Sequence, residues 1–169
     1  MLLHLLIVFL CPETIQLLKV VRKENTLYTA EVYEKLANLR GRQQKYDKAS
    51  LLLEECLKIR IEELGMGHEL VAKALYSLGV LFCKRNQFDA GLKAFTDCLS
   101  IQQLTLGSES LETADTLHAI GQCLGNNGDF KNACNMWGRA YEVYTKHKSP
   151  KVKAIKRDLR LAYKMLEEG

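Results

Sequence analysis

Proline is almost absent from this sequence of 169 residues. The two prolines, Pro12 and Pro150, lie near opposite ends, so the roughly 137 residues between them contain no obligate helix breaker. Hydrophobic residues make up 47% of the chain and charged residues 26%, which excludes an intrinsically disordered protein. The composition therefore favours a folded, helical chain.

A general excess of positive charge is also missing. The formal net charge of +4 arises in residues 145–169, which hold eight Lys or Arg against three Asp or Glu. The rest of the chain holds sixteen against seventeen. A nucleic-acid-binding surface needs a larger basic surplus and aromatic side chains placed to stack on bases, so we expect no nucleic-acid partner.

The cysteines form no CxxC pair, and the histidines show no ligand spacing among themselves or with the cysteines. These residues are Cys11, Cys56, Cys83, Cys98, Cys123 and Cys134, with His4, His68, His118 and His147. The neighbours of the cysteines are apolar, helix-forming residues, which predicts free thiols that pack as small hydrophobic groups in a reducing compartment. We expect no metal site and no cofactor.

The N-terminal segment from Leu2 to Cys11 is apolar except for His4. It is about as long as the core of a signal peptide, but no Lys or Arg precedes it and no small-x-small cleavage site follows. A run of ten residues is too short to span a bilayer as a helix, which needs about twenty. We expect a packing segment in a cytoplasmic protein. A signal peptide for the secretory pathway and a truncated start within a longer repeat array are the alternatives.

A period of 42 residues appears when the chain is aligned with itself. Equivalent positions carry side chains of the same size class in three copies. The small positions are Ala30, Ala72 and Ala114; Ala37, Gly79 and Gly121; Ala49, Gly91 and Ala133; and Cys56, Cys98 and Ala140. The large positions are Leu36, Leu78 and Ile120; Tyr46, Phe88 and Phe130; and Leu53, Phe95 and Trp137. Small residues allow two antiparallel helices to approach closely, and the large residues fill the space between neighbouring pairs.

Apolar spacings of three and four indicate helices throughout the repeats. The expected helices are 30–43, 47–63, 71–85, 89–104, 112–126, 130–146 and about 151–167. Gly65 and Gly107 are predicted to end helices in a left-handed conformation, and Pro150 is predicted to mark the third joint.

These registered positions resemble the tetratricopeptide repeat (TPR). The long period, with Leu64-Gly65 and Leu106-Gly107 before each new pair, is similar to the variant found in kinesin light chains. The resemblance covers about residues 30–164 and implies an all-α fold, an α-solenoid of antiparallel helix pairs with about three TPR units and a C-terminal capping helix. The implied divisions are an N-terminal apolar segment and leading helix (1–29), TPR 1 (30–70), TPR 2 (71–111), TPR 3 (112–148) and a basic capping helix (149–169).

In the TPR fold, the first helices of successive pairs line a concave groove that holds a partner protein or peptide. The groove candidates are Glu31, Glu34, Lys35, Asn38, Arg42, Lys73, Tyr76, Ser77, Val80, Lys84, Asp115, His118, Gln122, Asn126, Arg157, Arg160 and Lys164. The last three share one face of the terminal helix, which favours an acidic partner. Glu34 stands where TPR proteins that bind a C-terminal carboxylate need a lysine, so we do not predict that specificity.

Catalytic motifs are absent: the sequence contains no Gly-rich phosphate loop, no GxSxG elbow and no HExxH helix. The sequence therefore predicts a scaffold or adaptor rather than an enzyme. One alternative is a thiol- or metal-dependent enzyme in which Cys83 and His118 meet across adjacent first helices. Another is a fragment of a longer TPR array that acts by stacking on itself or on further repeats.

Overall fold

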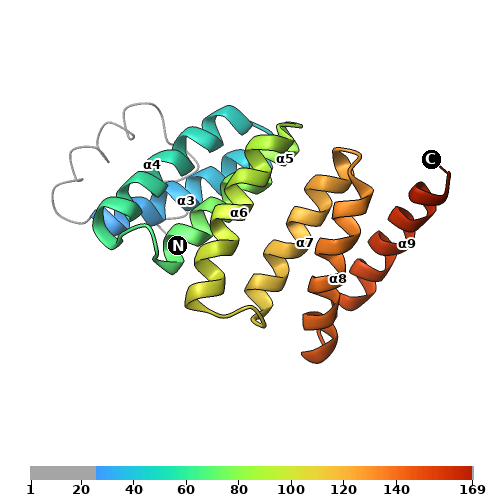
Figure 1. Ribbon diagram of the computed structural model, residues 1–169. Coiled ribbons are helices and arrows are strands. Elements are labelled where there is room, and N and C mark those ends of the chain that lie inside the picture. Colours follow the sequence, from blue (N-terminus) through green and yellow to red (C-terminus); the bar gives the residue numbers. More distant parts are fainter. Residues whose placement is uncertain (1–25, 169) are drawn as a thin grey trace. The chain divides into compact units, whose positions relative to one another are not determined.

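The computed structural model describes residues 26–168 and divides the chain into two compact units, residues 1–66 and 67–169. The predicted N-terminal packing segment and Cys11 lie outside the described residues. Every regular element in the described part is a helix (Figure 1). The helices are α3 (Thr26–Arg42), α4 (Tyr46–Leu64), α5 (Glu69–Lys84), α6 (Phe88–Thr105), α7 (Leu111–Asn126), α8 (Phe130–Lys146) and α9 (Val152–Glu168).

This arrangement confirms the all-α fold class and the expected helices. The largest difference in bounds is the start of α3, which begins at Thr26 rather than at residue 30. Along residues 26–168, no helix is both long enough and apolar enough to cross a membrane.

In the first unit, α3 and α4 pack against each other as one antiparallel hairpin. The small residues Ala37 and Ala49 and the large residue Leu53 are buried, as the repeat pattern predicts. One buried ion pair also joins the two helices: the Arg60 guanidinium donates to a Glu34 carboxylate oxygen at 2.8 Å. The ion pair satisfies two charges that would be costly to bury alone.

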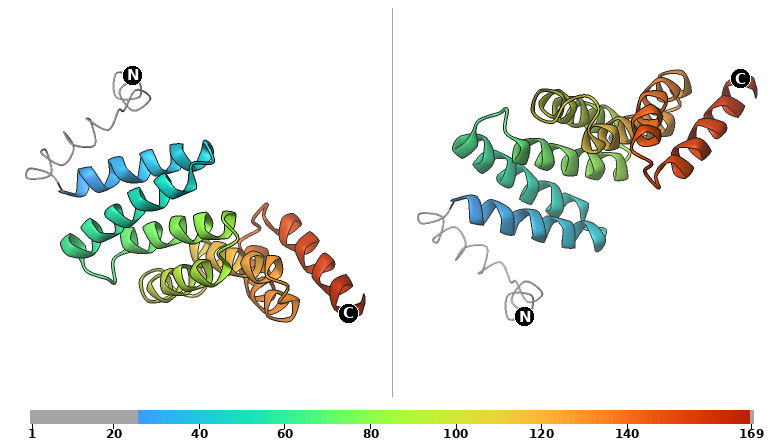
Figure 2. Two further views of the ribbon diagram at one scale, coloured as in Figure 1. Left: turned by 90° about the horizontal axis from the view of Figure 1, so that it is seen from above. Right: turned by 90° about the horizontal axis from the view of Figure 1, so that it is seen from below.

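In the second unit, α5 pairs with α6 and α7 with α8, while α9 packs mainly on α8 (Figure 2). In each of these two pairs, an aromatic ring of the second helix packs directly on a glycine of the first helix. A Cβ atom added at Gly79 would lie 2.7 Å from ring carbons of Phe95, and one added at Gly121 would lie 2.5 Å from Trp137. Neither position has room for a side chain, so glycine sets how closely the paired helices approach.

The turns inside the hairpins share one conformation. Gln44, Asn86 and Gly128 occupy equivalent positions 42 residues apart, and all three have a positive φ, of 59°, 58° and 86°. The joints between pairs use the predicted glycines, since φ is 82° at Gly65 and 85° at Gly107. Both predicted glycines have a positive φ. At Gly65, however, ψ is 159°, which is an extended conformation open to glycine and not the predicted left-handed helical one.

The described cysteines are all free thiols, as expected, and three of them are buried: Cys56, Cys98 and Cys123. Cys56 and Cys98 occupy a small position that Ala140 fills in the third repeat, and all three side chains are fully buried. These thiols therefore pack as small apolar groups.

Candidate functional site

Side chains of α5 and α7, together with Gln102 of α6 and Leu106 at its end, form a hollow in the second unit, where the groove was predicted. The hollow has a volume of about 250 Å³, and its lining combines carboxylates, one ammonium and one aromatic ring. The lining residues are Glu69, Lys73, Tyr76, Gln102, Leu106, Glu112 and Asp115. Three of them, Lys73, Tyr76 and Asp115, are predicted groove residues and come from the first helices of two successive pairs.

Tyr76 is the aromatic platform of this hollow, and packing beneath it holds the ring in place. Its ring meets the buried Phe95 ring edge to face, with centroids 5.5 Å apart. Burial, with a smaller contribution from the charge of Asp115, raises the pKa of the Tyr76 hydroxyl. Tyr76 is therefore a neutral, positioned ring that can pack against an apolar or peptide group of a ligand.

Asp115 is already engaged at the edge of the hollow. Its carboxylate accepts a hydrogen bond of 2.6 Å from the Tyr144 hydroxyl and contacts Lys151 Nζ at 2.6 Å through both oxygens. Burial and the bond to Asp115 raise the pKa of Tyr144. Asp115 thus links α7 to α8 and to the residue preceding α9, a role that the sequence pattern did not reveal.

His118 is likewise bound to α9. Its Nε2 lies 2.9 Å from an oxygen of Asp158, and only 13% and 15% of the two side chains are exposed. Gln122 contacts the same ring nitrogen at 3.4 Å. His118 therefore belongs to the attachment of α9, and it offers a ligand much less surface than the prediction assumed.

A second hollow, of about 390 Å³, contains the other two α7 candidates, Gln122 and Asn126. Leu161 of α9 and Trp137 of α8 also line it. Leu161 is 59% exposed, so both amide groups and an accessible apolar side chain line this hollow. Repeat register alone did not identify Leu161.

The cationic candidates of α9 do not join the hollow between α5 and α7. Arg160 and Lys164 line a different hollow together with Tyr141 of α8. Arg157 lines neither; its side chain is 80% exposed and lies 3.4 Å from Asp158. Of the three cations that were predicted to act together, two line this hollow, and Arg157 lies one turn earlier on α9.

The remaining candidates differ in accessibility. Glu34 is buried in its ion pair with Arg60, which corrects its prediction as a groove residue. The exposed candidates are Glu31, Lys35, Asn38 and Arg42 of α3, and Lys73 and Lys84 of α5. Ser77 and Val80 are half-buried.

The thiol and imidazole of the alternative enzyme do not pair. The Cys83 thiol makes its hydrogen bond with Cys123, whereas His118 contacts Asp158 and Gln122. Burial, reinforced by Cys123, raises the pKa of Cys83 to about 12, and burial raises that of Cys98 to about 11. Both thiols stay protonated near neutral pH, which is the opposite of what a thiol nucleophile needs.

Stacked helix pairs joined in this register define a helical-repeat protein. The family model of the tetratricopeptide repeat matches residues 28–101 and 70–146, and the chain belongs to this family. TPR proteins are typically scaffolds that bind other proteins. The family match confirms the resemblance to the tetratricopeptide repeat that the sequence pattern indicated.

Solved structures support the same fold. BtubC (BKLC) from P. vanneervenii has a TM-score of 0.81 at 22% identity, over 86% of this chain and 59% of that one. A putative kinesin light chain with TPR-like repeats from Podosopora anserina has a TM-score of 0.74 at 18% identity, over 90% and 75%. The apo form of RapI has a TM-score of 0.79 at 16% identity, over 89% and 54%.

One curated relative is the clustered mitochondria protein homolog of Brugia malayi. It is 28% identical over 82 residues, which are 48% of this chain and 6% of that protein. The chain therefore spans a small part of the length of this relative.

Proposed function

We propose that this chain is a cytoplasmic scaffold or adaptor whose hollow between α5 and α7 holds a segment of a partner protein. The observation that carries the proposal is Tyr76, a half-buried ring held by Phe95 beside polar side chains from two successive first helices. A fixed aromatic group surrounded by polar groups is the usual composition of an energetically important contact in a protein interface.

Charge narrows the class of partner for this hollow. Glu69, Glu112 and Asp115 line it against a single cation, Lys73. The carboxylate of Asp115 is neutralised by Lys151, so the two glutamates supply most of the remaining charge. A neutral or basic segment fits this hollow, whereas the acidic partner suggested by the basic tail fits the separate surface of α9.

Peptides selected for binding to the full chain from a random display library provide the test. The variant Tyr76→Ala should weaken selected peptides by about tenfold or more, because truncating a central aromatic contact typically has an effect of this size. The matched control is Leu104→Ala on α6. Leu104 is 89% exposed and does not line the hollow.

Equal losses in the two alanine variants would contradict binding in the hollow. Because Tyr76 also packs on Phe95, the exposed Glu112→Lys provides a second variant that leaves the core untouched. Glu112→Lys should weaken basic peptides while the melting temperature of the protein stays unchanged. Unaltered affinity for basic peptides would contradict the proposal that the glutamates of the hollow attract basic segments.

A further inference from the structure

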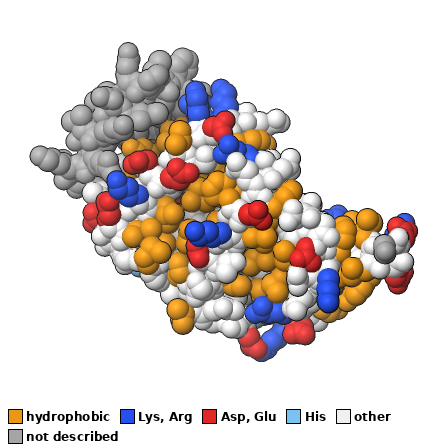
Figure 3. Space-filling model, turned by 45° about the horizontal axis from the view of Figure 1, so that its top comes forward, with side chains coloured by type: hydrophobic (Ala, Val, Ile, Leu, Met, Phe, Trp, Pro, Cys, Tyr) orange, Lys and Arg blue, Asp and Glu red, His pale blue; other side chains and the backbone are white. Residues whose placement is uncertain are grey.

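The terminal helix α9 exposes more apolar surface than a helix that only caps a stack. It buries Ile155 and Ala162, but four large apolar side chains on the helix are more than 40% exposed. They are Leu161 (59%), Tyr163 (57%), Met165 (41%) and Leu166 (47%). Figure 3 shows apolar side chains gathered on the surface at this end of the second unit. A capping helix is expected to present a polar outer face, so part of this surface is suited to a partner.

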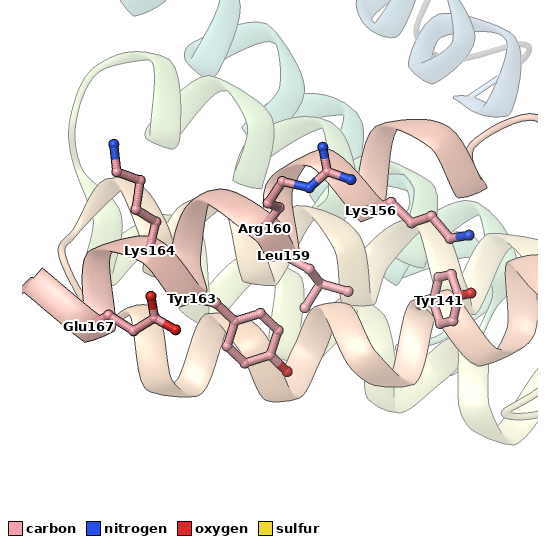
Figure 4. A pocket seen from close by; sticks show the side chains of 7 residues that line it. All are labelled: Tyr141, Lys156, Leu159, Arg160, Tyr163, Lys164 and Glu167. Carbon is pink, nitrogen blue, oxygen red and sulfur yellow. The ribbon is translucent and has the colours of Figure 1, made fainter.

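One side of α9 forms a shallow hollow with α8, which we call the α9 surface. Its volume is about 530 Å³, and its main lining residues are Tyr141 of α8 with Lys156, Leu159, Arg160, Tyr163 and Lys164 of α9. The α9 residues recur at spacings of three and four, so they share one helix face. In Figure 4 the three cations lie along one edge, and Leu159, Tyr163 and Tyr141 lie along the other.

The charge of the α9 surface is positive. Lys156, Arg160 and Lys164 face a single lining carboxylate, Glu167. Lys156 Nζ lies 5.6 Å from the centre of the Tyr141 ring, and Lys164 Nζ lies 3.6 Å from Glu168 in an exposed pair. Arg160 forms no ion pair within residues 26–168. At least this guanidinium is available to a carboxylate from outside.

We propose that the α9 surface binds an amphipathic helix of a partner protein that carries carboxylates beside a row of apolar side chains. The apolar row packs on Leu159, Tyr163 and the ring of Tyr141, while the carboxylates meet Arg160 and Lys164. From Lys156 to Glu167 the surface extends along α9 for about 16 Å, which corresponds to about three helical turns. A partner helix of similar length covers it.

Charge favours this occupant over a second copy of α9. A second α9 would bring its own three cations to a surface that already carries three, whereas an acidic helix supplies the opposite charge. The proposal goes beyond the binding of a segment between α5 and α7, because none of its lining residues belongs to that hollow.

A designed peptide tests the proposal on the full chain. The probe is a fluorescein-labelled helical peptide of about 16 residues with leucines along one face and glutamates beside them. Fluorescence anisotropy should show saturable binding that weakens as the salt concentration rises from about 0.05 M to about 0.5 M, because exposed charges are screened. A peptide with lysines in place of the glutamates should not bind.

Two double variants with the same change of charge locate the site. Arg160→Glu with Lys164→Glu should weaken binding about tenfold, whereas Lys131→Glu with Arg139→Glu, exposed on α8 and outside the lining of the α9 surface, should change it less than about twofold. The lysine peptide should bind the first variant better than it binds the parent chain. Tyr163→Ala, which alters no charge, should also weaken binding of the glutamate peptide.

Three results would overturn the proposal. Equal losses in the two double variants would indicate nonspecific attraction to positive charge anywhere on the second unit. If Tyr76→Ala abolished binding of the glutamate peptide, the peptide would be bound in the hollow between α5 and α7 instead. A dimer that dissociates in Arg160→Glu with Lys164→Glu, and that excludes the peptide, would assign the surface to a second copy. If Tyr76→Ala still binds the glutamate peptide, the α9 surface acts independently of the hollow between α5 and α7. The two proposals can therefore fail separately.

Discussion

The first hairpin and the two that follow solve the same packing problem with different side chains. In the first, the equivalent positions hold Ala37 and Leu53, both buried. The later hairpins replace this pair by glycine and an aromatic ring, Phe95 over Gly79 and Trp137 over Gly121. A larger ring is thus accommodated by removing a methyl group from the facing helix, and side-chain volume is conserved in the pair rather than in the single residue.

The largest effect should come from removing the aromatic ring. Trp137→Ala and Phe95→Ala should each lower the free energy of unfolding by about 3–5 kcal/mol, because a large cavity opens beside a glycine that cannot fill it. Trp137 also donates from Nε1 to the carbonyl of His118 at 3.2 Å, and this bond is lost with the ring. Urea unfolding followed by circular dichroism measures the change. Losses under about 1 kcal/mol would show that the rings do not fill the repeat core.

Adding the missing methyl group should have the next largest effect. Gly79→Ala places a Cβ atom 2.7 Å from the Phe95 ring, and overpacking of this kind costs about 1–3 kcal/mol. Alanine recovers about 1 kcal/mol of helix propensity, so we expect a net loss of up to about 2 kcal/mol. Gly138→Ala in α8 is the matched control, because its Cβ would meet no atom within 4 Å, and it should stabilise the chain.

A double variant sharpens the comparison between the hairpins. Gly79→Ala with Phe95→Leu recreates the pair found at Ala37 and Leu53. The double variant should be more stable than the sum of the two single changes predicts, by about 1 kcal/mol. Additive losses would mean that the two positions are independent and that the difference between hairpins is accidental.

Some parts of the molecule could be predicted from the sequence, and others could not. Helix bounds and pairing follow from apolar spacing and repeat register, which are local properties of the chain. The ion pair of Glu34 with Arg60 and the contact of His118 with Asp158 join residues 26 and 40 positions apart. They depend on the rotation of one helix against another, which the register of a single helix does not specify.

The terminal helix illustrates the same limit at the candidate site. Ala162 lies 42 residues after Ile120, and both residues are buried. The repeat register assigned Arg160 and Lys164 to the groove, but these side chains line the hollow beside Tyr141. Among the described residues no helix pairs with α9 as α8 pairs with α7, and the side chains next to that position line this separate hollow.

The hairpin turns should show a smaller, graded effect. Gln44, Asn86 and Gly128 hold the same left-handed conformation, which costs a residue with a Cβ atom about 1–2 kcal/mol. Gln44→Gly should therefore stabilise the chain by about 1 kcal/mol and Asn86→Gly by less, since asparagine tolerates this conformation better. Gly128→Ala should destabilise it. The melting temperatures of the three variants measure these effects. Equal changes at all three turns would contradict the prediction.

The smallest effects should be at the buried thiols. Cys56→Ala and Cys98→Ala should each cost less than about 1 kcal/mol, because Ala140 fills the equivalent position of the third repeat. Cys98 should be the more sensitive, since its sulfur lies 3.7 Å from the Thr116 hydroxyl. Folding yield and melting temperature, each with and without reducing agent, measure the change. Loss of folding in reducing agent would show that a disulfide, and not packing, stabilises the chain.

The central claim is that successive first helices of the second unit present a binding surface. Amide hydrogen exchange of the full chain, with and without a peptide selected from the display library, tests it most directly. We expect slower exchange in α5 and α7 on binding, because contacts at Tyr76 and Glu112 suppress local opening of these helices. Slower exchange confined to α6 and α8, with none in α5 and α7, would contradict the account.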